Sequence, residues 1–305
     1  MIHTEFHKWL TQYKGLSRKT AYLYTLRIDR FSKMFGNITA YSSLEVLEFV
    51  LNMEKSVSDH NGWVIALTRY QHFCEFNGQN VTFAEKLHTK SEPPKLPKPF
   101  TEEEIDSICS HVPLHSVVGK RDRAILELLY CGLRNNEVCT TTVNSLENET
   151  ILVFGKGAKE RYVPINDVAW NFLLDHVLIQ YGTIEELESA GAHGLDFAFV
   201  GLKERLSGTS LPIFRTSIGN TIYPRAIRHI VSRYARLANV HNAHPHRFRH
   251  SFATHTLDAG LGNITALRDV MGHTKLDMTQ RYVLTTKIGR ERVKSFHPRQ
   301  RRQAL

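Results

Sequence analysis

The sequence predicts a mainly α-helical protein with a small antiparallel β-sheet or hairpin, and three observations carry this prediction. Apolar residues recur at helical spacing along most of the chain. Two short β-type runs flank a glycine-rich turn within 150–165. A proline-rich stretch at 88–99 separates two helical regions, and 305 residues is about twice the usual domain length. We therefore expect domains at 1–87 and 100–305, joined by a linker at 88–99.

The first region is expected to be helical and basic. Ser17 is placed to cap a helix, and Gly36 is placed to end it. Between them lies one apolar stripe at spacings of four, three and four, made of Tyr24, Ile28, Phe31 and Phe35. Two further helices are expected near 43–54 and 60–77. The outward basic residues, including Arg18, Lys19 and Arg27, fit either a solvated helix face or a nucleic-acid surface.

The linker has four prolines within seven residues, which favours extended backbone and excludes a helix. It contains Lys90, Lys95 and Lys98, and these would suit a segment lying along a polyanion. A semi-rigid spacer between domains is the minimum interpretation.

The bulk composition narrows the functional class. The net charge of +9, from 39 basic and 30 acidic residues, favours a polyanionic partner, nucleic acid first, over a merely basic surface. No apolar run approaches the roughly 18 residues that span a membrane, and the N-terminus lacks a signal-peptide core, so we expect a cytoplasmic protein. The four cysteines are scattered, which favours buried free thiols over disulfides or a zinc module.

An arginine stands out early in the second region. A capping box at Thr101 to Glu104 opens one helix, and a second is expected from Lys120 to Tyr130. A short helix then restarts, with Asn135 or Asn136 as its cap. Arg134 lies at the junction, where its guanidinium could bind an anion. The alternative is a structural ion pair between Arg134 and Glu137.

The expected hairpin carries a lysine between two glycines. Lys156 follows the first strand, and Lys159 and Arg161 follow in turn. The Gly-Lys-Gly pattern is too short for a nucleotide-binding P-loop. The turn of this hairpin is suited to entering a DNA groove. The alternative is an exposed turn whose lysines serve only the solubility of the protein.

The C-terminal third gathers groups suited to acid–base chemistry. A helix at 223–237 is expected to face Arg225 and Arg228 outward. In the next helix, which Pro245 starts, His246 and Arg249 share a face. A helix from Asn263 ends at Gly272, directly before His273, and Tyr282 falls within a further helix. No role is predicted for 182–212.

The crowding of histidines raises the possibility of a metal site. The group comprises His241, His244, His246, His250 and His255. No cysteine lies nearby, and the glutamate that accompanies a metal-binding His-x3-His pair is missing. We therefore expect no metal.

The motifs taken together resemble the tyrosine recombinases, or phage integrase family, especially its Xer-like members with two domains. Gly-Leu-Ser-x-x-Thr resembles the start of the family's N-terminal core-binding, SAM-like domain. Leu-Tyr-Cys-Gly-Leu-Arg134-x-x-Glu resembles its first arginine motif, and Gly-Lys156-Gly-x-Lys-Glu-Arg-x-Val-Pro its catalytic-lysine hairpin. His246-x-x-Arg249, Met-Gly-His273 and Tyr282 follow in the family's order and spacing. One departure is Thr140-Thr-Thr-Val in place of a leucine- and tryptophan-rich stretch.

The resemblance implies an N-terminal DNA-binding domain and a C-terminal α+β catalytic domain that recombines duplex DNA at paired sites. Tyr282 would form a 3′-phosphotyrosine, and strand exchange would pass through a Holliday junction in a tetramer, of one protein or of two related recombinases, without cofactor, metal or ATP. The expected catalytic residues are Arg134, Lys156, His246, Arg249, His273 and Tyr282. The residues expected to contact DNA are Arg18, Lys19, Arg27, Lys95, Lys98, Lys159, Arg161, Arg225 and Arg228. The alternatives are a type IB topoisomerase-like enzyme and a DNA-binding protein that does not cleave; a metal-dependent nuclease is disfavoured by the scarcity of clustered carboxylates.

Overall fold

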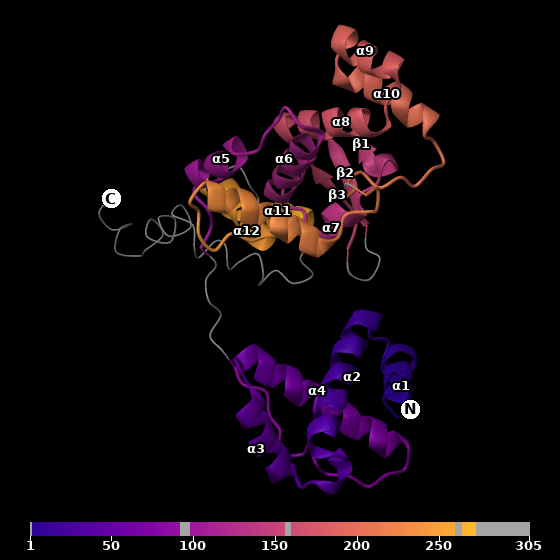
Figure 1. The fold of residues 1–305 in the computed structure, drawn as a ribbon, viewed down its shortest axis with the longest axis vertical. Coiled ribbons are helices and arrows are strands. Elements are labelled where there is room, and N and C mark those ends of the chain that lie inside the picture. The colour runs from indigo at the N-terminus through magenta and orange to yellow at the C-terminus, as the bar shows by residue number, and fades with distance from the viewer. Residues whose placement is uncertain (1, 92–97, 156–159, 217, 260–263, 273–305) are drawn as a thin grey trace, which may run out of the picture. The chain divides into compact units, whose positions relative to one another are not determined.

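The computed structural model describes residues 2–91, 98–155, 160–216, 218–259 and 264–272 (Figure 1). The chain divides into two compact units, Met1–Lys95 and Leu96–Leu305. The division falls within the expected linker. The ends of that linker are held by the units themselves: the Lys90 backbone N–H donates to Asn61 (2.7 Å), and the Lys98 carbonyl accepts from Arg247 (3.0 Å).

The described part of the first unit is helical and has no strand. Its elements are α1 (Ile2–Lys8), the π-helical segment η1 (Trp9–Tyr13), α2 (Arg18–Phe35), the 3-10 turn η2 (Ile38–Ala40), α3 (Ser43–Met53) and α4 (Val57–Phe76). Ser17 caps α2 by accepting from the Thr20 backbone N–H at 3.2 Å. Gly36 ends this helix at φ +80°, a conformation that side chains with a Cβ rarely adopt. Both ends of α2 are thus as predicted, whereas α1 and η1 were not foreseen.

Aromatic side chains form much of the core of the first unit. Phe49 stands edge-on to Trp63 with ring centroids 5.4 Å apart, and Phe6 stands edge-on to Tyr70 at 5.1 Å. Such edge-to-face pairs add to the stabilisation that burial alone gives. The apolar stripe predicted on α2 contributes Ile28 and Phe31, which are both fully buried.

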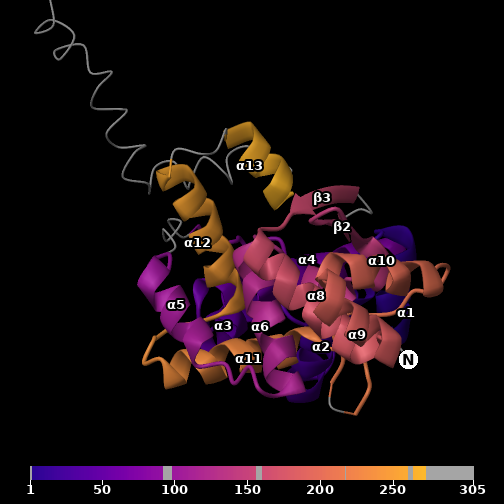
Figure 2. The ribbon, with the colours of Figure 1, turned by 90° about the horizontal axis from the view of Figure 1, so that it is seen from above.

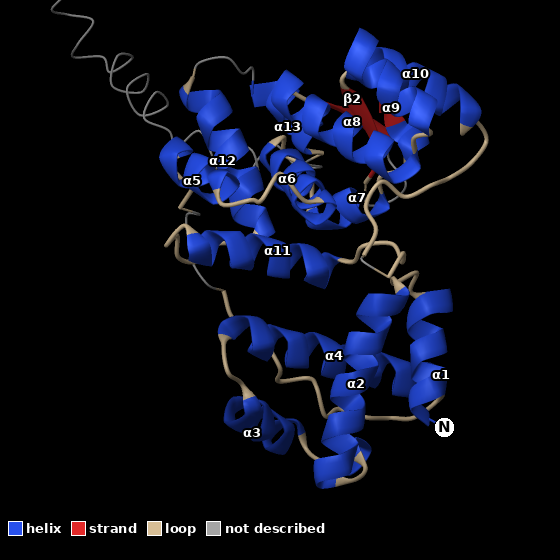
Figure 3. Ribbon diagram, turned by 45° about the horizontal axis from the view of Figure 1, so that its top comes forward, coloured by secondary structure: helices blue, strands red, loops and turns tan. Residues whose placement is uncertain are grey.

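The second unit combines many helices with one small sheet, which lies at the edge of the unit (Figures 2 and 3). Its elements are α5 (Glu102–Ser110), α6 (Val117–Tyr130), α7 (Asn135–Thr140), the 3-10 turn η3 (Val143–Ser145), β1 (Leu146–Glu147), β2 (Thr150–Phe154), β3 (Glu160–Pro164), α8 (Asp167–Tyr181), α9 (Ile184–His193), α10 (Leu195–Arg205), α11 (Pro224–Leu237), α12 (Pro245–Asp258) and α13 (Ile264–Met271). The mainly α architecture with a small antiparallel sheet is confirmed. No helix in the described ranges is long and apolar enough to cross a membrane.

The sheet contains the predicted hairpin and one further short strand. Its order is β1-β2-β3, antiparallel throughout, with Ile151 opposite Val163 and Val153 opposite Arg161. Ile151, Val153 and Val163 are buried, so one face of the hairpin packs on the core. β1 has only two residues, which is too short for a periodic signal in the sequence.

The stretch without a prediction, 182–212, contains α9 and α10. Thr183 and Glu186 form a capping box that starts α9. In α10, Phe199 stands edge-on to Trp170 of α8 at 6.0 Å, and Asp196 accepts from the Trp170 indole N–H at 2.7 Å. The two helices therefore extend the layer formed by α8.

Helices α6 and α12 pack against each other in the second unit. The buried residues of α11 are those predicted, Ile227, Ile230, Val231 and Tyr234 among them. The C-terminal end of α13 lies beside β3 (Figure 2). All four cysteines are buried free thiols, as expected.

Candidate active site

Arg134 begins helix α7, where the sequence suggested that Asn135 or Asn136 would be the cap. That expectation was wrong because the backbone N–H of Arg134 donates to Glu137 Oε2 at 2.7 Å, which makes Arg134 the N-cap residue. Its guanidinium Nη1 donates to Glu137 Oε1 at 2.8 Å. The structural ion pair is thus present, but it occupies only one side of the guanidinium.

Arg249 reaches the same place from the middle of α12. Its side chain is almost entirely buried, and it donates to the carbonyl oxygens of Gly132 and Met271. The close approach depends on Gly132, which follows α6 at φ +90°. A Cβ on this glycine would lie 2.7 Å from the ring of Phe252 on α12. The missing side chain therefore lets α12 pack against the turn before Arg134.

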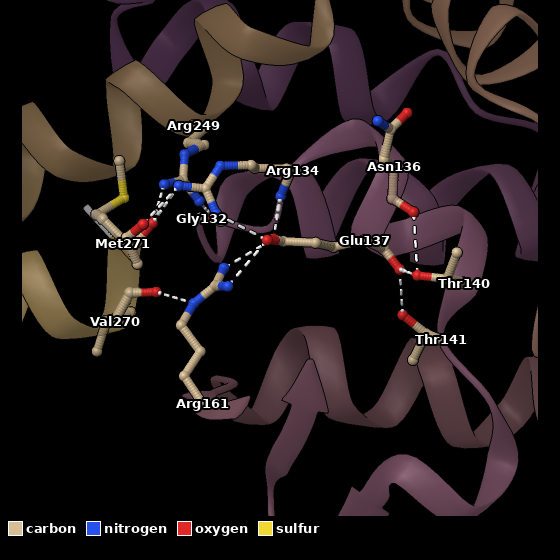
Figure 4. Close-up of polar contacts among 11 residues, drawn as sticks. Gly132, Arg134, Asn136, Glu137, Thr140, Thr141, Arg161, Arg249, Val270 and Met271 are labelled. Atoms are coloured by element: carbon tan, nitrogen blue, oxygen red, sulfur yellow. Dashed lines mark hydrogen bonds and ion pairs between the residues drawn. The ribbon is translucent and has the colours of Figure 1, made fainter. Parts of the chain in front are cut away.

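The two guanidiniums converge on the C-terminal end of α13 (Figure 4). Arg134 Nη2 donates to the carbonyl oxygens of Met271 at 3.0 Å and Gly272 at 2.8 Å, and Arg249 also donates to that of Met271. Carbonyl oxygens at a helix C-terminus carry partial negative charge. Two forked cations aimed at one oxygen form a site that suits the non-bridging oxygens of a phosphate.

His246 lies one turn before Arg249, on the first turn of α12. Its surroundings lower its pKa, first through loss of hydration and then through the positive charges of Arg249, His244 and Arg134. The side chain nevertheless remains exposed. The imidazole is therefore neutral at pH 7 and accessible, as an acceptor of a proton requires.

Arg161 has a different environment from the one expected of it. The sequence placed it among the DNA-contacting residues, but its side chain is only 12% exposed. Nη1 and Nη2 donate to the two oxygens of Glu137 at 2.9 and 2.7 Å, and Nε donates to the Val270 carbonyl at 2.8 Å. The expectation of a DNA contact is corrected because this guanidinium is committed to protein partners. A signal was available: Arg161 is two residues from Val163 and so shares its inward face.

Glu137 carries the negative charge between the two arginines. Burial alone would raise the pKa of this carboxyl group, but hydrogen bonds from Arg161 and from the Arg134 backbone, together with the charge of Arg161, lower it to about 2. The carboxylate is thus ionised throughout the neutral range. In the sequence, Glu137 is indicated as the possible ion-pair partner of Arg134 and as the glutamate of the Arg134-x-x-Glu motif, but its contact with Arg161 is not predicted.

Several expected site residues lie outside the described residues. These are Lys95, Lys156, Lys159, His273 and Tyr282. For two of them, the structure describes the residue directly before: Gly155, which follows β2, precedes Lys156, and Gly272, which follows α13, precedes His273.

The other expected DNA contacts differ in exposure. Arg18, Lys19, Lys98, Arg225 and Arg228 are exposed. Arg27 instead pairs with Asp59 at 3.1 Å with its side chain 24% exposed, which leaves it less available than expected.

The neighbouring histidines have structural partners that the sequence did not reveal. His244 caps α12 by accepting from the Arg247 backbone N–H at 3.2 Å. His255 Nε2 lies 2.9 Å from the Phe100 carbonyl, which can only accept, so Nδ1 accepts from the Tyr130 hydroxyl at 2.7 Å. Desolvation lowers the pKa of His250 to about 4. Caps and tertiary contacts therefore account for much of the crowding.

Comparison with known proteins assigns the chain to a family. Residues 98–287 match the phage integrase family. The chain belongs to that family. It is 30% identical over 277 residues to "Tyrosine recombinase XerA" of Thermococcus onnurineus, covering 90% of this chain and 87% of the relative. Its counterpart in Thermococcus kodakarensis is 31% identical over 286 residues, covering 92% and 90%. The expected kinship with Xer-like tyrosine recombinases is confirmed.

Solved structures share the fold. The XerH site-specific recombinase bound to a palindromic difH substrate superposes with a TM-score of 0.68 at 20% identity, covering 96% of this chain and 84% of that one. A lambda integrase dimer bound to a COC′ core site gives 0.63 at 13% identity, covering 92% and 93%. The family therefore supports a recombinase enzyme, and the topoisomerase and non-cleaving alternatives are not favoured.

Proposed function

We propose that this protein is a site-specific DNA recombinase that cuts and rejoins duplex DNA through a 3′-phosphotyrosine at Tyr282. The observation that carries the proposal is the meeting of Arg134 and Arg249 at one oxygen acceptor. Family membership supports the reaction class, and the arginine pair supports the place where it happens.

The scissile phosphate takes the position of the α13 carbonyls between the two arginines. Attack by the Tyr282 oxygen on phosphorus forms the P–O bond to tyrosine and breaks the bond to the 5′-oxygen. Charge builds on the non-bridging oxygens in the transition state, where two guanidiniums stabilise it. Removing one such donor typically costs roughly 3 kcal/mol of transition-state stabilisation. Because the phosphotyrosine keeps the phosphodiester bond energy, rejoining needs no ATP.

Proton transfer is assigned to the remaining groups. His246 is neutral and close to both arginines, so it accepts the proton of the attacking tyrosine. Lys156 protonates the leaving 5′-oxygen, and His273 donates a hydrogen bond to the phosphate. These last two roles rest on the family resemblance and on positions next to Gly155 and Gly272.

The partner is double-stranded DNA with paired recombination sites. The relatives solved as XerH and lambda integrase are bound to DNA substrates, and the net charge of this chain is +9. Exposed basic residues, Arg18, Lys19, Lys98, Arg225 and Arg228, supply phosphate contacts that weaken with salt. We further propose an N-terminal core-binding domain, a C-terminal catalytic domain, assembly as a tetramer on two sites, and action in the cytoplasm on the nucleoid.

Covalent trapping tests the proposal. The Tyr282→Phe variant, which keeps the phosphate contacts, is used first to select bound sequences from a random duplex library. A nick near the centre of the selected site then lets the released fragment diffuse away, so that cleavage by the wild type accumulates as a denaturation-resistant protein–DNA adduct in EDTA and without ATP. No adduct with the wild type, or an equal adduct with Tyr282→Phe, would contradict the proposal.

A further inference from the structure

We propose that Arg161 is a positioning residue for the strand-transfer reaction: it neutralises Glu137 and thereby leaves the charge of Arg134 available to the scissile phosphate. This inference rests on the proposed function. Arg161 itself does not touch the DNA in this account.

The geometry shows one carboxylate shared by two arginines. Each Glu137 oxygen accepts from both of them: Oε1 from Arg134 Nη1 at 2.8 Å and Arg161 Nη1 at 2.9 Å, and Oε2 from the Arg134 backbone N–H and Arg161 Nη2, both at 2.7 Å. The Arg161 contact is the two-pronged arrangement that binds a carboxylate most strongly. Arg134 gives Glu137 only one guanidinium nitrogen, while its Nη2 points to the α13 end.

The charges show why the second arginine matters. Arg134, Arg161 and Arg249 contribute three positive charges, and Glu137 contributes one negative charge. Because the positive charge of Arg161 balances the negative charge of the carboxylate, the charges of Arg134 and Arg249 both remain available to the phosphate. Without Arg161, the 5% exposed Glu137 has Arg134 as its remaining arginine partner. Because the interior screens charges poorly, that pairing would weaken the attraction of Arg134 for an anion.

Arg161 also joins the segments that carry the expected catalytic residues. It lies on β3, five residues after Lys156, and its Nε holds the Val270 carbonyl of α13 at 2.8 Å. A Cβ on Gly272 would lie 3.0 Å from its guanidinium, so this glycine, at φ +58°, packs directly on Arg161. His273 is the next residue. One side chain therefore sets the spacing between the Arg134 turn, the hairpin strand and the chain entering His273.

The test compares cleavage rates on the nicked substrate under single-turnover conditions, with folding checked by thermal unfolding. Arg161→Gln is expected to cleave roughly 10- to 100-fold more slowly than the wild type. Arg161→Lys keeps the positive charge, so it is expected to recover most of the cleavage rate that Arg161→Gln loses. The double variant Arg161→Gln/Glu137→Gln removes the stranded carboxylate and is expected to be faster than Arg161→Gln alone.

The matched control is Arg205→Gln. Arg205 makes the same kind of two-pronged pair, with Glu186 at 3.0 and 2.9 Å, away from the site. It is expected to cleave at the wild-type rate.

A pH profile separates this role from a merely structural one. Arg161 contributes hydrogen bonds and a positive charge that lower the pKa of Glu137, so removal of Arg161 raises this pKa. The carboxylate then becomes neutral at a higher pH than in the wild type, and its protonation releases Arg134. The rate advantage of the double variant over Arg161→Gln therefore shrinks on acidification.

Three outcomes would each overturn the inference. The first is a folded Arg161→Gln that cleaves like Arg205→Gln, and the second is a folded Arg161→Lys that is as slow as Arg161→Gln. The third is a rate advantage of the double variant that does not depend on pH. Absence of any wild-type adduct would instead contradict the proposed function.

Discussion

Arg134 and Arg249 donate to the same acceptor, the carbonyl oxygen of Met271 at the end of α13. One arginine comes from the turn after α6, and the other from α12, more than a hundred residues later. Their meeting point is therefore a product of the tertiary fold and is held in place before DNA arrives. Under the proposed function, an entering phosphate would compete with the Met271 and Gly272 carbonyls for these guanidinium donors.

Replacement of Arg249 by lysine should separate charge from geometry. Arg249→Lys keeps the positive charge but loses the planar fork that reaches Gly132 and Met271 together. We expect the single-turnover cleavage rate to fall roughly 100- to 1000-fold. Binding measured by gel shift should weaken much less, because most of the affinity comes from other phosphate contacts. Wild-type cleavage by Arg249→Lys would show that only charge matters at this position.

Gly132→Ala should destabilise the second unit. The residue adopts φ +90°, and the added methyl group would lie 2.7 Å from Phe252. We expect a loss of about 1–3 kcal/mol in the free energy of unfolding, measured by denaturant titration. Gly208→Ala is the matched control for backbone strain, since its φ is +79° but no atom lies within 4 Å of the added Cβ. Equal losses in the two variants would mean that the contact with Phe252 has no cost.

Glu137 should make stability depend on pH in the acid range. Its pKa of about 2 in the folded protein lies below its ordinary value of 4.5. The stabilisation is therefore fully present above pH 4.5 and is lost as the pH falls from 4.5 towards 2. The difference corresponds to about 3 kcal/mol as an order of magnitude.

Thermal unfolding of the wild type and Glu137→Gln between pH 7 and pH 3 checks this dependence. The wild type should lose its advantage over the variant within the acid window and keep it constant between pH 5 and 7. An advantage that stays unchanged down to pH 3 would contradict the assigned ionisation.

Protonation of His246 should cause the fall of the cleavage rate at acid pH. Because its pKa is lowered from 6.5, the neutral form that accepts a proton is dominant at pH 7 and is lost only on stronger acidification. The single-turnover rate should therefore hold near pH 7 and fall with an apparent pKa below 6.5. His246→Gln should be slower at pH 7 and should lack this inflection. An unchanged inflection in the variant would assign it to another group.

Local rules explain the elements that the sequence predicted well. The caps at Ser17 and Thr101 and the stop at Gly36 involve residues close together in the chain, so their positions could be read directly. The capping box of Thr183 and Glu186 carries the same kind of signal, but the surrounding stretch lacks a clear apolar period, so the sequence does not predict a helix there.

Long-range contacts explain what was missed. The sequence indicated Arg134, His246 and Arg249 as one site only through family resemblance, since nothing local brings α12 to the turn after α6. The partner of Arg161 lies 24 residues away in the chain, so a surface role was the natural first interpretation. Strand alternation with Val163 indicates an inward face for Arg161. Its pairing with Glu137 follows from the packing of the sheet against α13, which no local pattern encodes.

The most direct test of the central claim is to identify the residue that becomes linked to DNA. The trapped adduct is digested with nuclease and trypsin, and the modified peptide is sequenced by mass spectrometry. Trypsin cuts after Arg281 and Lys287, so we expect a nucleotide linked through its 3′-phosphate to Tyr282 in the peptide 282–287, or in 276–287 if the cut at Arg281 is blocked. A nucleotide found on any other residue, or a 5′-phosphate linkage, would contradict it.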